Sequence, residues 1–208
     1  MAQAEAVPNP PRGTRKAEQA AATRAALLRV ARELFTARGY GSTGTEDIVE
    51  QAGMTMGALY YHFRDKRDLF RAVFEEVEAE FDQIGRDAAA GVEEPWEAFI
   101  AGCVANVDAC RRPDIHQICM LDAPSVLGWE TWRKIDGAFS MRSMRGALRA
   151  MISAGQIADE PTEPLAALLI GALNEAGLMI AHADDPSAVR ESVMDSLLRF
   201  LERLRIAQ

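Results

Sequence analysis

Apolar residues along this chain recur at intervals of three and four, the spacing that places them on one face of an α-helix. The first such stripe ends at Gly39 and consists of Ala26, Leu27, Val30, Ala31, Leu34 and Phe35. No segment alternates between apolar and polar residues with a period of two, and no internal repeat is present. The pattern therefore predicts an all-α protein.

Proline and glycine residues divide the remainder into helical segments. Two short helices are expected within residues 43–63, and a longer one follows Asp65, a good N-cap residue, and continues to about Phe81. Beyond a break at Gly91–Pro95, five further helices are predicted, over approximately 96–110, 113–122, 128–154, 162–183 and 187–205. The total is about nine helices.

Charge is distributed unevenly between the two ends of the 208-residue chain, whose formal net charge is −8. Residues 1–74 carry 11 Lys and Arg and 8 Asp and Glu, a net charge of +3, which leaves −11 on residues 75–208. Since only the N-terminal part is cationic, we expect only that part to approach a polyanion. The division predicts a disordered tail over 1–18, a first domain over 19–74 and a second domain over 75–208.

Composition narrows the class of protein. Hydrophobic residues make up 49% and charged residues 26%, as in ordinary globular chains. Charged residues interrupt every apolar run that approaches the ~20 residues of a membrane span, and the N-terminus has no apolar leader. The three cysteines, Cys103, Cys110 and Cys119, form an odd and sparse set that suits a reducing compartment. We expect a soluble cytoplasmic protein with no membrane partner.

The most informative segment spans residues 39–70 and reads GYGSTGTEDIVEQAGMTMGALYYHFRDKRDLF. Thr43 and Glu46 have capping-box spacing at the start of one short helix. Gly53 permits the left-handed turn that ends this helix, and Thr55 can cap a second one. Two short helices joined by a glycine turn are typical of a helix-turn-helix.

The second short helix is the candidate recognition helix. Its spacing turns Leu59 and Phe63 to one face and leaves Gly57 and Tyr61 on the other. A helix of this kind enters the major groove, where glycine permits close approach and tyrosine hydroxyls can bond phosphates. By spacing alone, an ordinary helical hairpin with a surface tyrosine is an equally good interpretation.

Three stretches of this segment resemble the DNA-binding domain of the TetR/AcrR family of bacterial transcriptional regulators. They are ELFTARGY at the end of the first helix, T-x-x-x-D-I-x-x-x-A-G from Thr43 to Gly53, and GALYYHFRDKRDLF from Gly57 to Phe70. The resemblance covers residues 23–70. It implies an obligate dimer of nine-helix subunits, in which helices one to three bind DNA and the others bind ligand and dimerise.

The resemblance also implies which residues contact DNA. The positions at which the family does so are occupied here by Thr45, Thr55, Gly57, Tyr60, Tyr61, His62 and Lys66. Met56 belongs to the same expected interface but departs from the pattern, because the family often has lysine there. Its thioether can pack on a thymine methyl group instead. Val49 is bulkier than the alanine usual at its position.

No catalytic, cofactor or metal site is expected. The chain has no phosphate loop, nucleophile elbow, zinc-protease motif or dinucleotide fingerprint. Cys103 and Cys110 share one predicted helix face, and His116, Cys119 and Asp122 share another. Because no second histidine joins them, core packing is a better interpretation than metal ligation.

The acidic second domain holds all three tryptophans and many methionines, which suit an apolar ligand cavity, although a helical core needs such residues anyway. Its charge favours a cationic or neutral ligand. The candidate lining residues are Phe99, Cys103, Met120, Trp129, Trp132, Phe139 and Asn174. The helix that begins after Asp65 is the only predicted one that runs from the DNA-binding helices into this domain. We therefore expect a ligand to act by tilting it.

Two apolar stripes near the C-terminus predict a four-helix dimer interface. They comprise Leu165, Leu168, Leu169, Ala172, Leu173, Ala176 and Ile180, and then Val189, Val193, Leu197, Leu201 and Leu204. Gly171 and Gly177 would allow close approach, and Leu197→Glu or Leu201→Glu should give monomers. The alternative is that both stripes face their own subunit.

Together these patterns predict a ligand-responsive transcriptional regulator that binds a palindromic double-stranded DNA operator as a homodimer. We expect a repressor that an unidentified small molecule releases. The alternative from another class is a helical protein-interaction module with a vestigial DNA-binding segment. The sequence does not name the ligand, the operator, the target genes or the sign of regulation, nor whether the N-terminal arm contacts DNA.

Overall fold

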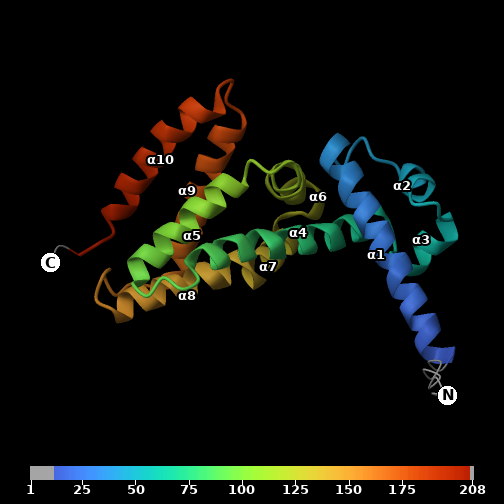
Figure 1. Ribbon diagram of the computed structural model, residues 1–208, viewed down its shortest axis with the longest axis horizontal. Helices are drawn as coiled ribbons and strands as arrows, with labels where there is room; N and C mark the ends of the chain where they lie inside the picture. The colour runs from blue at the N-terminus through green and yellow to red at the C-terminus, as the bar shows by residue number, and fades with distance from the viewer. Residues whose placement is uncertain (1–11, 207–208) are drawn as a thin grey trace, which may run out of the picture.

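The structure is a computed structural model that describes residues 12–206, and the long regular elements in this range are all helices (Figure 1). The N-terminal end consists of α1 (Arg12–Arg38), α2 (Thr45–Gln51) and α3 (Met56–His62). From there α4 (Lys66–Ala89) runs into a larger helical body (Figure 1). The body also contains α5 (Pro95–Ala109), the π-helical segment η1 (Ile115–Asp122), α6 (Ala123–Leu127), α7 (Trp129–Ala138), α8 (Ser140–Ser153), α9 (Thr162–Ala181) and α10 (Pro186–Glu202). The prediction of an all-α fold is confirmed.

One predicted helix is divided in the structure, and the segment that follows another is also helical. The helix expected over 128–154 is interrupted at Phe139, whose φ of −119° and ψ of −96° are not helical. The helix expected over 113–122 forms as the π-helical η1, and α6, which was not predicted, follows it up to Gly128, where φ is +73°. Apolar spacing continues through the break at Phe139, so periodicity could not reveal it. The described residues therefore form ten α-helices and η1.

The N-terminal helix begins earlier than predicted. Residues 12–18, expected in a disordered tail, form the first turns of α1, whereas residues 1–11 lie outside the described range. The stretch from Arg15 to Ala22 is almost entirely Ala, Lys, Arg, Glu and Gln, which have high helix propensities. The helix can therefore extend without an apolar face to bury.

Two hydrophobic cores hold the chain together. The first joins α1–α4 to η1, α6 and α7, and includes the fully buried side chains of Phe35, Phe70 and Phe74. The second joins α5 and α8–α10 around Leu148 and Met151. Both the first core and α4 run through the domain boundary expected after residue 74. Helices α1–α3 are thus attached to the body by shared packing, without a linker.

Among the described helices, α9 alone is long and apolar enough to cross a membrane by length and composition. Its buried side, which includes Leu169 and Leu173, belongs to the second core. At Gly177 it lies so close to α5 that a Cβ atom there would be 2.5 Å from the Cys110 side chain. We therefore interpret α9 as a core helix, and Gly177 serves packing within the subunit, not across a dimer interface.

Candidate DNA-binding surface and ligand cavity

The recognition helix α3 is fixed by local interactions. Thr55 is its N-cap residue, and the Thr55 hydroxyl accepts a hydrogen bond from the amide of Ala58 at 3.2 Å. Gly53, with φ of +63°, forms the turn after α2. Leu59 and Phe63 are buried in the first core. The predicted cap, turn and inward face of this helix are all confirmed.

The predicted capping box at the start of α2 is wrong. The N-cap residue is Gly44, and the Asp47 carboxylate accepts a hydrogen bond from its amide at 3.0 Å. Thr43 is buried, and its hydroxyl donates to the carbonyl oxygen of Gly39 at 2.8 Å. This threonine therefore satisfies a carbonyl group at the end of α1 and is not available to cap α2.

The outward face of α3 is open to solvent. Tyr61 is 76% exposed, Tyr60 is 51% exposed, and Thr55 and Gly57 are exposed too. A Cβ atom on Gly57 would meet no atom nearer than the Thr55 hydroxyl at 3.8 Å. The fold itself thus has no steric need for glycine at this position. The face offers hydroxyl groups and unobstructed backbone to a partner.

The remaining predicted contact residues flank this face. Thr45 and His62 are half-buried, and the His62 ring lies edge-on to Tyr61 at 4.9 Å. Met56 packs partly against the first core. The ammonium nitrogen of Lys66 lies 4.0 Å from the centroid of the Tyr40 ring. All eight predicted residues belong to α2, α3, the α3 cap or the first residue of α4, so the structure gathers them at one end of the molecule.

A cavity of about 610 Å³ lies in the body, where the two cores meet. Five predicted residues line it: Phe99, Cys103, Met120, Trp132 and Asn174. The structure does not place the other two, Trp129 and Phe139, in the lining. Trp129 is 71% exposed, and Phe139 packs on the first core at the break between α7 and α8. Trp129 is the first residue of α7, directly after the non-helical Gly128, and Phe139 is the residue at which the expected helix over 128–154 is interrupted.

The lining also contains three buried carboxylates that were not predicted from the sequence, on Glu78, Asp82 and Asp136. Glu78 and Asp82 lie one turn apart on α4, each next to a residue of its buried apolar stripe. The sequence did contain a signal for them, namely a pair of acidic residues inside the apolar stripe of α4. The residues predicted to line the cavity are almost all apolar, so these carboxylates were not among them.

These carboxylates differ in their partners. Asp82 pairs with Arg86, and Asp136 pairs with Arg133 at 2.9 Å. Glu78 accepts a hydrogen bond from the Ser140 hydroxyl at 2.6 Å but forms no salt bridge within residues 12–206. Burial raises the pKa of Glu78 from 4.5 to about 7.

Replacing Glu78 by glutamine should make stability less dependent on pH. Because its pKa is higher in the folded than in the unfolded state, the carboxyl group destabilises the fold as pH rises from about 4.5 through about 7. Glu78→Gln should be more stable than the wild type by about 3 kcal/mol at pH 8 but by less than about 1 kcal/mol at pH 5. Urea denaturation at pH 5 and at pH 8 measures the free energy of unfolding of both proteins.

Glu93→Gln, at an exposed carboxylate of the same cavity, is the matched control and should show no such difference. An equal effect at both pH values would contradict a buried, titrating Glu78.

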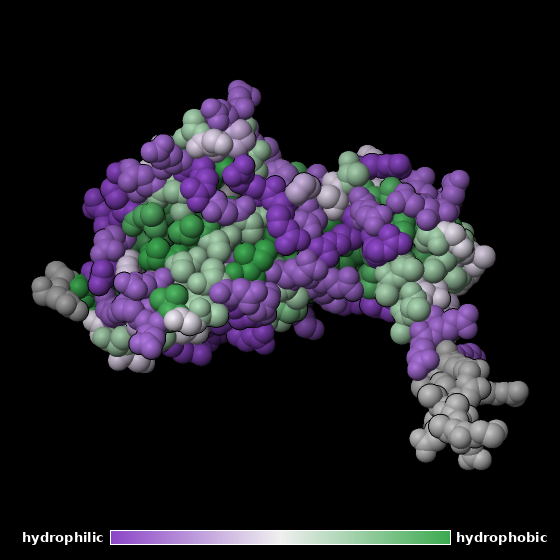
Figure 2. Space-filling model, in the orientation of Figure 1, coloured by the Kyte–Doolittle hydropathy of each residue, from purple (hydrophilic) through white to green (hydrophobic). Residues whose placement is uncertain are grey.

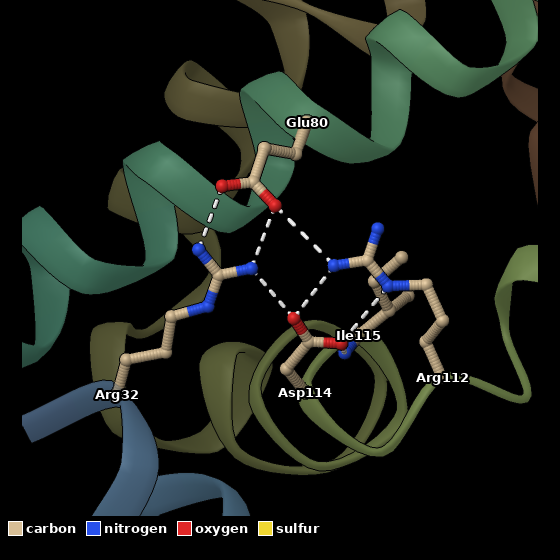
Figure 3. A network of polar contacts seen from close by, with 5 residues as sticks. All are labelled: Arg32, Glu80, Arg112, Asp114 and Ile115. Atoms are coloured by element: carbon tan, nitrogen blue, oxygen red, sulfur yellow. Dashed lines mark hydrogen bonds and ion pairs between the residues drawn. The ribbon is translucent and has the colours of Figure 1, made fainter. Parts of the chain in front are cut away.

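A polar network connects the DNA-binding helices to the start of η1 (Figure 3). Arg32 of α1 donates two hydrogen bonds to Glu80 of α4, at 2.7 and 2.6 Å, and one to Asp114 at 2.6 Å. Arg112 donates to Asp114 and Glu80 from the other side. Asp114 in turn accepts from the amide of Ile115, the first residue of η1. The network holds α1, α4 and η1 in one arrangement.

The other end of the η1–α6 segment is also attached to the DNA-binding helices. The Asp122 carboxylate accepts a hydrogen bond at 2.8 Å from the amide of Tyr40, which follows α1. The guanidinium group of Arg67, in the first turn of α4, donates to the last two carbonyl groups of α6. Between these attachments Cys119 and Met120 line the cavity. One segment therefore contacts both the cavity and the DNA-binding helices.

Within the described residues, no group of three or more potential metal ligands is present. The three cysteines are free and buried. Burial raises the pKa of the Cys103 thiol and of the Cys110 thiol to about 12, so both stay protonated. They act as core and lining residues.

An exposed recognition helix, joined by a shared core to a helical body with a cavity, is the architecture of a helix-turn-helix transcriptional regulator. The family model for bacterial regulatory proteins of the tetR family matches residues 27–73. The model for the tetracyclin repressor-like C-terminal domain matches residues 96–204. The chain belongs to the TetR family, as its motifs indicated.

Individual relatives agree with this assignment. A TetR-family transcriptional regulator from Pectobacterium atrosepticum has 34% identity and a TM-score of 0.78, over 91% of this chain and 97% of that one. The transcriptional regulator AcrR of Shigella flexneri is 42% identical over 67 residues, 32% of this chain and 31% of that protein. The matches therefore span about a third of such curated relatives. RolR in complex with resorcinol shares the fold, with 22% identity and a TM-score of 0.67 over 88% and 89% of the chains. The first two of these relatives are named as transcriptional regulators.

Proposed function

We propose that this protein is a cytoplasmic repressor that binds a palindromic operator as a homodimer and is released when a small molecule occupies the cavity. The observation that carries the proposal is the η1–α6 segment, because it lines the cavity and also bonds to Tyr40 and α4. The structure of RolR with resorcinol supports the idea that this fold accepts a small organic ligand. Resorcinol itself is not implied for this chain.

DNA binding is tested first by selecting genomic fragments with the purified protein. Fragments that share a palindrome, with half-sites one helical turn apart, would support a two-fold complex. Specific retention that weakens steeply as salt increases is expected, because phosphate contacts release counter-ions. A reporter gene behind the selected operator then gives the sign of regulation. A protein-interaction module would retain no specific fragment.

Gly57→Ala should weaken operator binding about tenfold without destabilising the protein. An added methyl group has open space in the free protein, and alanine favours the helix over glycine. In the complex the same methyl group would stand between α3 and the DNA. Fluorescence anisotropy with a labelled operator measures the affinity, and thermal unfolding measures the stability.

Gly137→Ala on α7 is the matched control. That glycine is also helical and exposed, and a Cβ atom added to it would have no other atom within 4 Å. Unchanged affinity of Gly57→Ala would contradict the placement of this face against DNA.

The dimer interface is expected on α9 and α10, but only part of the two predicted stripes, including Leu168, is exposed and can contribute to it. Leu197 and Leu201 are buried in the second core, so glutamate at either position should damage the subunit itself. The apolar residues that remain exposed include Leu168 (72%) and Met179 on α9, and Phe200 on α10. In Figure 2, hydrophobic side chains also gather on the visible face of the body, within a hydrophilic surround. We propose that the exposed apolar residues of α9 and α10 pair across the two-fold axis.

A further inference from the structure

The charged groups of the cavity are predominantly acidic. Its lining contains four carboxylates, on Glu78, Asp82, Glu93 and Asp136, and one guanidinium group, on Arg86. Arg86 is already paired with Asp82, and Asp136 is paired with Arg133 from α7. Glu93 is exposed to solvent. Glu78 is therefore the buried lining carboxylate for which residues 12–206 supply no cation.

The surroundings of Glu78 do not neutralise it. It is 4% exposed, and its neutral neighbours are the Ser140 hydroxyl, at 2.6 Å, and the Cys119 thiol. The charged groups that act on it are Asp82 and Asp136, both acidic, which oppose its ionisation further. A buried carboxylate without a cation is costly unless a partner arrives. A bound cation would remove this cost.

A second acceptor in the same cavity also lacks a partner. The side-chain oxygen of Asn106, on α5, is buried and accepts no hydrogen bond. This side chain lies directly against Gly85 of α4, where a Cβ atom would come within 2.8 Å of it. A buried carbonyl oxygen without a donor is unfavourable, so a ligand that carries an N–H group would satisfy it. The remaining lining is largely apolar and aromatic, with Phe81, Phe99 and Trp132 among its members.

We propose that the cavity binds an amphipathic organic cation, whose protonated amine pairs with Glu78 while its apolar part lies against the aromatic lining. This inference rests on the function proposed above, because it names the class of molecule that occupies the same cavity. A volume of about 610 Å³ is adequate for a drug-sized molecule of this type. Neutral phenols and anions would leave the Glu78 charge without compensation.

The experiment compares two probes that differ mainly in charge, N-benzyloctylamine, which is protonated at pH 7.5, and the neutral N-benzyloctanamide. Both carry an N–H group on nearly the same apolar body. Calorimetric titration of the full-length protein should show the amine binding at least about tenfold more tightly than the amide. Glu78→Gln should weaken amine binding about tenfold or more and leave amide binding nearly unchanged. Glu76→Gln, which removes an exposed carboxylate of α4 outside the cavity lining, should change neither.

Equal affinity for the two probes, no binding of either probe, or an equal loss for both in Glu78→Gln would overturn the cation assignment. A parallel operator-binding assay separates this failure from failure of the proposed function. If the amide binds in the cavity and releases DNA as well as the amine, ligand-responsive regulation stands and the cation class is wrong. If the protein without any probe retains no specific DNA, the proposed function itself is wrong.

Discussion

Leu168→Glu should convert the homodimer into folded monomers and weaken operator binding by about two to four orders of magnitude. The Leu168 side chain is 72% exposed in the subunit, so a carboxylate there costs the monomer little. In a two-fold interface the same change would bury two unpaired charges, one from each subunit. Each monomer could then hold only one half-site, and the gain from simultaneous binding of both would be lost. Light scattering gives the oligomeric state, and anisotropy gives the operator affinity.

Two comparison variants make this result specific. Ala138→Glu places the same charge on an exposed position of α7 and should leave the dimer intact. Leu201→Glu, at a fully buried position of the second core, should lower the stability of the subunit itself. A wild-type protein that is monomeric at micromolar concentration, or a dimeric Leu168→Glu variant, would contradict the interface.

The recognition helix could be predicted from the sequence because its determinants are local. The amide group that the Thr55 hydroxyl caps lies only three residues further along the chain. Gly53 forms the turn by its own backbone conformation. Leu59 and Phe63 are one turn apart, so their common burial follows from helical geometry. Such signals need no knowledge of distant segments, and the family resemblance rests on the same residues.

The ligand cavity could be predicted only in part, because its geometry depends on segments far apart in the sequence. Apolar spacing identified lining residues such as Phe99 and Trp132, but it could not place the breaks at Gly128 and Phe139, at or next to which the two predicted residues outside the lining, Trp129 and Phe139, lie. The Glu78 carboxylate bonds to Ser140, 62 residues later in the chain. A sequence pattern cannot show that these two meet, and the buried acidic wall was therefore missed.

The structure offers a second route from the cavity to the DNA-binding helices, besides the one expected. The sequence indicated α4 as the only helix that joins the two parts, and α4 does line the cavity. The structure adds the η1–α6 segment, held at one end by Arg32 through Asp114 and at the other by Tyr40 and Arg67. A π-helical segment is a rare local form that often occurs at functional sites. A ligand that displaces the middle of the η1–α6 segment would therefore move the turn after α1.

Asp122→Ala should therefore reduce the release of DNA by a cavity ligand while leaving ligand binding almost intact. The Asp122 carboxylate accepts the Tyr40 amide at 2.8 Å, and a hydrogen bond to a charged group contributes about 1.5–3 kcal/mol. Coupling between two sites is usually about 1–3 kcal/mol, so the loss of this bond can remove most of it. With N-benzyloctylamine in the cavity, the ratio of operator affinities without and with the probe should fall about tenfold relative to wild type.

The conservative variant Asp122→Asn tests whether the hydrogen bond suffices without the charge, because the asparagine oxygen can still accept from the Tyr40 amide. It should respond to the probe much like the wild type. Trp132 fluorescence reports probe binding in each variant, since Trp132 lines the cavity. By linkage, operator DNA must weaken probe binding by the same factor by which the probe weakens DNA binding, and Asp122→Ala should shrink both factors equally. Full DNA release in Asp122→Ala would show that η1 does not carry the signal and would leave α4 as the element that moves the recognition helices.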